Sequence, residues 1–94
     1  MPDQETPDLY ADQFIVTNTV WGTNISFLKM PPHPSPGQAP QPIPQVVVRM
    51  SLQHAKVMTM MLRRQLKQWE RDNGMDIGVP HSVYAALGVS PEDW

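Results

Sequence analysis

The chain has 94 residues, a length that allows one small domain and little more. It contains no cysteine, which excludes disulfides and thiolate metal sites. Its formal net charge of −2 excludes a strongly basic protein, but five of the seven Lys and Arg residues lie between residues 56 and 71.

The first nine residues combine three acidic residues with two prolines and few apolar side chains. Such a composition cannot offset the entropy of ordering, so we predict a disordered acidic tail at 1–9. No apolar run approaches the roughly 20 residues of a membrane span, and the start of the chain lacks a basic region followed by an apolar stretch. We therefore expect a cytoplasmic protein without a membrane segment.

Two segments with alternating apolar residues follow the tail. Residues 10–20 place Phe14, Val16 and Val20 on one side of a two-residue period, and residues 24–30 place Ile25 and Phe27 on one side. A glycine at position 22 lies between them. The pattern predicts a β-hairpin.

Seven of the fourteen residues from 31 to 44 are prolines, so this segment is predicted to be a stiff connection without regular structure. A proline-reading domain could recognise it as an extended ligand, but we favour a connector because no basic anchor flanks the prolines. Residues 45–50 then alternate again and predict a third strand, able to pair with either edge of the hairpin.

One long helix is predicted from Ser51, which can cap its start, to Gly74, which can stop it. An apolar stripe recurs every three or four residues along the helix, at Leu52, Ala55, Met58, Thr59, Leu62, Leu66 and Trp69. Basic residues gather on the opposite side, at Lys56, Arg63, Arg64, Lys67 and Arg71. Residues 75–94 are predicted to be a C-terminal appendage with a short helix at 79–87, a second helix start at Ser90, and Trp94 as an apolar plug.

The predicted fold is therefore α+β, with a three-stranded antiparallel sheet, a Pro-rich loop between strands 2 and 3, and one long amphipathic helix within residues 10–74. This order of elements, with Tyr10-Ala11 opening the first strand and Ser51, His54, Ala55 and Lys56 opening the helix, resembles a small bacterial family known as domain of unknown function 3467. The resemblance implies a strand-strand-strand-helix unit and no assigned activity.

Catalytic and metal-binding patterns are absent from the sequence. The three histidines lie in different segments without metal-ligand spacing, and Ser51 and His54 are better explained by helix capping than by a catalytic triad. Residues 72–83 lack the glycine and glutamate of a calcium loop. We expect no enzyme and no cofactor.

The apolar surface exceeds what one helix and one small sheet can bury, so we predict a homodimer. Val57, Met60 and Met61 point away from the apolar stripe and are the predicted dimer interface. The function favoured is a protein–protein interaction module or a small subunit of a larger assembly. The alternative is a nucleic-acid-binding dimer that uses Lys56, Arg63, Arg64, Lys67 and Arg71, although no aromatic residue is interleaved with these bases.

Overall fold

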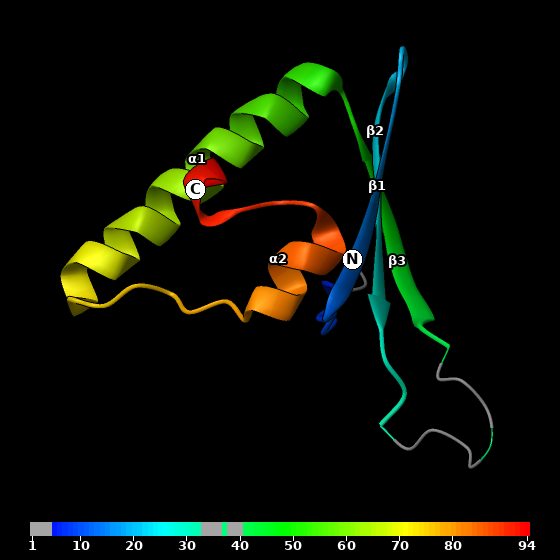
Figure 1. The fold of residues 1–94 in the computed structure, drawn as a ribbon. Coiled ribbons are helices and arrows are strands. Elements are labelled where there is room, and N and C mark those ends of the chain that lie inside the picture. Colours follow the sequence, from blue (N-terminus) through cyan, green and yellow to red (C-terminus); the bar gives the residue numbers. More distant parts are fainter. Residues whose placement is uncertain (1–4, 33–36, 38–40) are drawn as a thin grey trace. The chain divides into compact units, whose positions relative to one another are not determined.

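The computed structural model describes residues 5–32, 37 and 41–94 and confirms the mixed α+β fold (Figure 1). Three strands, β1 (Gln13–Thr19), β2 (Gly22–Lys29) and β3 (Ile43–Met50), precede the helices α1 (Leu52–Asn73) and α2 (His81–Leu87) and the 3₁₀ turn η1 (Pro91–Asp93). The chain divides within α1 into two compact units, 1–58 and 59–94. Each is described by itself below.

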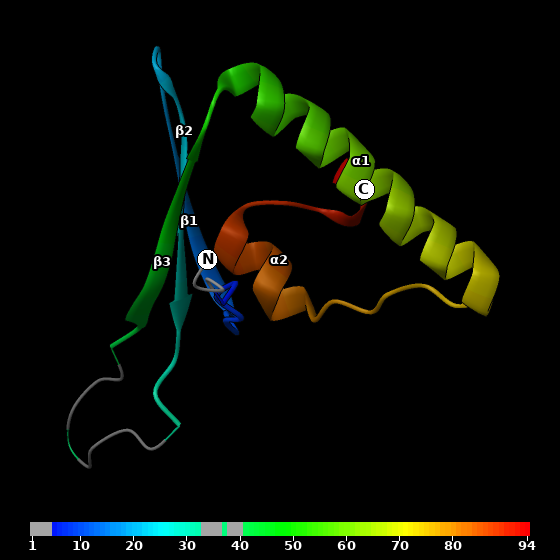
Figure 2. The same ribbon diagram turned by 180° about the vertical axis from the view of Figure 1, so that it is seen from behind.

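The sheet is antiparallel with the order β1-β2-β3, so β2 is central in both views of the ribbon (Figures 1 and 2). Thr19 pairs with Gly22 across a two-residue loop, in which the Trp21 amide donates to Thr19 Oγ1 at 3.1 Å. Gly22 has a φ of +150°, and a Cβ there would come within 2.5 Å of the Met50 carbonyl oxygen. Only glycine therefore allows the hairpin to lie against the end of β3.

The third strand begins earlier than predicted, at Ile43 instead of Gln45. Pro44 pairs with Leu28, and Val46 pairs with Phe27, so Gln45 is an extra residue that bulges out of the ladder. Proline is tolerated here because β3 is an edge strand, where one backbone N–H has no strand partner to lose. Residues 33–36 and 38–40 of the predicted Pro-rich loop lie outside the described residues.

Helix α1 starts and stops where the sequence predicts. The Ser51 Oγ accepts a hydrogen bond from the His54 amide at 3.0 Å, which caps the first turn. At the other end, Gly74 takes the left-handed conformation with a φ of +62°, and the Met75 amide donates to the Glu70 carbonyl at 3.2 Å.

The short C-terminal helix is also confirmed, although it begins at His81 because Pro80 is its N-cap. Gly88 ends α2 with a φ of 69°, and the Val89 amide donates to the Tyr84 carbonyl at 3.1 Å. Ser90 then opens η1, where its amide donates to Asp93 Oδ2 at 2.8 Å. The predicted tail at 1–9 is only partly described: residues 5–9 are exposed and without regular structure, and residues 1–4 lie outside the described residues.

Candidate protein interface

The two faces of the sheet differ in chemistry, because residues paired across strands share a face. One row joins Phe14, Phe27 and Val46, and the next joins Val16, Ile25 and Val48. We call these six residues the apolar sheet face. The opposite face is formed by the alternate rows, one of which joins Ile15, Ser26 and Val47 and the other Thr17, Asn24 and Arg49, so four of its six residues are polar.

The apolar sheet face is substantially open to solvent. Phe14 is 56% exposed and Val16 is 47% exposed, and Val46 and Val48 are also exposed. At its end, Thr23 is 4% exposed and donates a hydrogen bond to Asn18 Oδ1 at 2.9 Å. Among the described residues, no large hydrophobic side chain is buried, so neither unit encloses a hydrophobic core.

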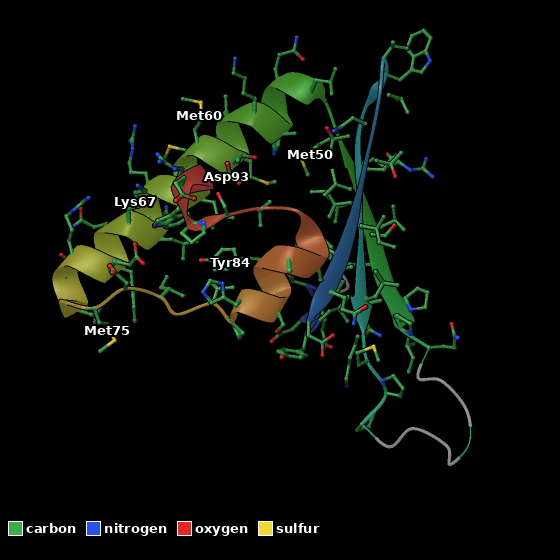
Figure 3. The ribbon with its side chains drawn as sticks, in the orientation of Figure 1. Met50, Met60, Lys67, Met75, Tyr84 and Asp93 are labelled. Carbon is green, nitrogen blue, oxygen red and sulfur yellow. The ribbon has the colours of Figure 1, made fainter. Side chains whose placement is uncertain are left out.

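The three predicted interface residues on α1 are all exposed. Met60, labelled in Figure 3, is 60% exposed, and Val57 and Met61 are exposed as well. Helical geometry stacks Val57 and Met61 one turn apart on the same side of α1, away from the stripe that contains Leu62 and Leu66. These side chains are available to a partner.

Two residues on the basic side of α1 contact Trp94. The Arg63 Nε donates to the backbone oxygen of Trp94 at 2.6 Å, and the Arg63 guanidinium carbon lies 5.9 Å from the centre of the Trp94 ring. The Lys67 Nζ lies 5.4 Å from the same centre, and Lys67 is half-buried. Trp94 is thus the aromatic partner of these bases that sequence proximity did not indicate.

Glu70 holds this arrangement together, and sequence reasoning missed it. Its Oε2 accepts from the Ile77 amide at 2.7 Å, and its Oε1 accepts from the Trp94 Nε1 at 3.0 Å. The Ile77 hydrogen bond, followed by the Trp94 hydrogen bond and the Lys67 charge, lowers the pKa of Glu70 below its ordinary value. One carboxylate therefore fixes both the segment after α1 and the last residue of the sequence.

Four of the five predicted nucleic-acid contacts line one shallow hollow on α1. Arg63, Arg64, Lys67 and Arg71 surround it together with Met60, and its volume is about 340 Å³. Arg71 also donates to Gln68 Oε1 at 2.6 Å. Lys56, in the other unit, is exposed.

The described part of the chain contains no group of three or more His, Cys, Asp or Glu residues that could hold a metal ion. None of the helices in that part combines the length and the hydrophobicity that a membrane span requires. No protein-family model matches the chain, and no curated protein or solved structure is detectably similar to it.

Proposed function

We propose that the chain is a non-catalytic protein–protein interaction module that completes its hydrophobic core by pairing with a second copy of itself. The observation that carries this proposal is the exposure of the apolar sheet face in a chain whose described residues include no buried large hydrophobic side chain. The resemblance to the bacterial domain of unknown function 3467 and a cytoplasmic location belong to the same proposal.

The energetics favour assembly over an isolated chain. Burying one Val, Leu, Ile, Phe or Met side chain contributes about 1.5 to 3 kcal/mol, and small domains have a total stability of about 5 to 15 kcal/mol. Several side chains, such as Phe14 and Met61, remain about half exposed in the single chain. The free energy that their complete burial would contribute is together comparable to the whole stability of the fold. A second copy would bury them without requiring a different protein.

The test is the oligomeric state of the full chain and its dependence on concentration. We expect sedimentation equilibrium to give a dimer at micromolar concentration, and the melting temperature to fall on dilution. Met61→Lys should shift the chain to monomer or unfolded protein, because it would place an unpaired charge in the contact. Met61→Leu keeps the apolar volume and should remain dimeric. A folded wild-type monomer with a concentration-independent melting temperature would refute the proposal.

Nucleic-acid binding is the second candidate function, and the contact of Trp94 with Arg63 and Lys67 favours it. Grooves that bind single-stranded nucleic acid combine Lys and Arg side chains, which contact the phosphates, with an aromatic ring on which a nucleobase stacks. Binding of a single-stranded oligonucleotide that weakens steeply with salt, and that is lost in R63Q/K67Q/R71Q, would support this function. No binding at low salt would exclude it.

A further inference from the structure

Strand β1 has an edge without the usual protection against pairing. Among the described residues, no strand lies beyond β1, and all seven of its residues are exposed. The strand contains no proline and no charged residue, and residues 13–28 as a whole contain no Asp, Glu, Lys or Arg. Natural sheets usually carry charged side chains, prolines or bulges on a free edge, because bare N–H and C=O groups attract further strands.

The opposite edge of the same sheet carries all three of these protections. Strand β3 has Pro44 near its start, the bulged Gln45 next to it, and the cation of Arg49 near its end. Strands β1 and β3 belong to one sheet and are of similar length, so neither the sheet nor the strand length explains why β1 alone lacks these protections. An edge that is left bare beside a protected one is typical of a strand that has a partner.

We propose that β1 pairs antiparallel with β1 of a second copy, so that the two three-stranded sheets become one continuous sheet. This inference rests on the proposed function and names one edge at which the two copies join, beside the apolar contacts already proposed. Pairing of identical antiparallel strands generates a two-fold axis, as a closed homodimer requires. The backbone groups of both edges are then satisfied by each other.

The chemistry of β1 suits a second copy. Since the strand is uncharged, self-pairing brings no like charges opposite one another. Pairing also extends the rows of Phe14 and Val16 across the two-fold axis, so the apolar sheet faces of the two copies join on one side. Self-pairing thus both satisfies the bare edge and doubles the apolar surface available for a shared core.

The two edges supply a matched pair of variants. Ile15 on β1 and Val47 on β3 lie in the same row and on the same face, and they are 58% and 53% exposed. The variant I15K/T17K places two neighbouring cations on that face of β1. The variant Val47→Lys likewise produces two neighbouring cations on that face of β3, because Arg49 is already there. We expect I15K/T17K to raise the dimer dissociation constant about 100-fold, because like charges would face each other across the axis. Val47→Lys should change it less than about threefold.

Single-cysteine variants provide a second readout that does not require dissociation, since the chain has no cysteine of its own. Antiparallel pairing brings one position near the middle of β1 within disulfide distance of its own copy. We expect a cysteine scan from Phe14 to Asn18 to give an oxidised covalent dimer, and Val46→Cys and Val48→Cys on β3 to give none.

The outcomes separate this inference from the proposed function. A wild-type dimer that tolerates I15K/T17K and forms no disulfide from β1 would overturn the strand pairing and leave the dimeric module standing. A wild-type monomer would overturn both, and a β1 whose amides are protected from hydrogen exchange only by a different protein would assign the edge to that partner instead.

Discussion

Truncation of Phe14 should weaken the dimer more than any other single change on the apolar sheet face of β1. An aromatic side chain buries about 150 to 250 Å² when it is fully enclosed, and Phe14 is 56% exposed in the single chain. A partner could therefore cover about 85 to 140 Å² of it, which corresponds to about 2 to 3.5 kcal/mol per copy. Because a symmetric dimer contains two copies, Phe14→Ala should raise the dissociation constant by about 10³-fold or more.

The measurement is sedimentation equilibrium over a dilution series, with far-ultraviolet circular dichroism to show that the variant retains its strands and helices. Val47→Ala is the matched control, since Val47 is 53% exposed but lies on the polar face of the sheet. Its dissociation constant should remain within about threefold of the wild type, as expected for a surface substitution. If Phe14→Ala raises the dissociation constant less than tenfold, the apolar sheet face is not part of the dimer contact.

Three further changes test single structural features. Gly22→Ala should cost about 1 to 3 kcal/mol in thermal unfolding, because alanine is strained at a φ of +150°, whereas Gly78→Ala, with open space around it, should be nearly neutral. Trp94→Ala should accelerate amide hydrogen exchange in the C-terminal segment and leave the strands protected, whereas Trp21→Ala should change neither, because Trp21 is 92% exposed. Because the pKa of Glu70 is lowered in the folded chain, its ionised carboxylate stabilises the fold at pH values above its ordinary pKa. This stabilisation is lost as the pH falls through the lowered pKa. The difference in melting temperature between wild type and Glu70→Gln should therefore shrink from about pH 6 to about pH 3. A difference that is constant over this range would show that the charge of Glu70 does not contribute.

Most of the fold follows from local sequence patterns. Alternation of apolar residues located all three strands, and the capping residue Ser51 and the stop at Gly74 located α1, because each of these signals acts over a few residues. The start of β3 was placed too late because proline disfavours strands in general. It is permitted here only by the position of β3 at the edge, which depends on the pairing of whole strands.

The candidate sites were less accessible from the sequence. Trp94 contacts Arg63 and Lys67, which lie 31 and 27 positions before it in the sequence. The periodicity of a helix or strand cannot predict a contact over such a separation. The role of Glu70 depends on the same return of the chain, since its partners are Ile77 and Trp94. Helical periodicity separates Val57, Met60 and Met61 from the apolar stripe of α1, but exposure does not distinguish the two sets, since Leu62 is 55% exposed and Met61 is 43% exposed.

The absence of charge from residues 13–28 also bears on how the proposed pair of chains would form. A hairpin with a two-residue loop forms within microseconds, whereas two chains meet at a rate proportional to their concentration. Each newly made chain would therefore expose an uncharged edge strand until it meets a second copy, for a time that depends on the concentration of the chain. Asp12 and Lys29 flank this segment in sequence, and Asp12 Oδ1 accepts from the Met30 amide at 3.1 Å, so the flanking charges lie at the open end of the hairpin. Refolding should accordingly have an optimal concentration, below which chains stay unpaired and above which β1 edges join into aggregates instead of closed pairs.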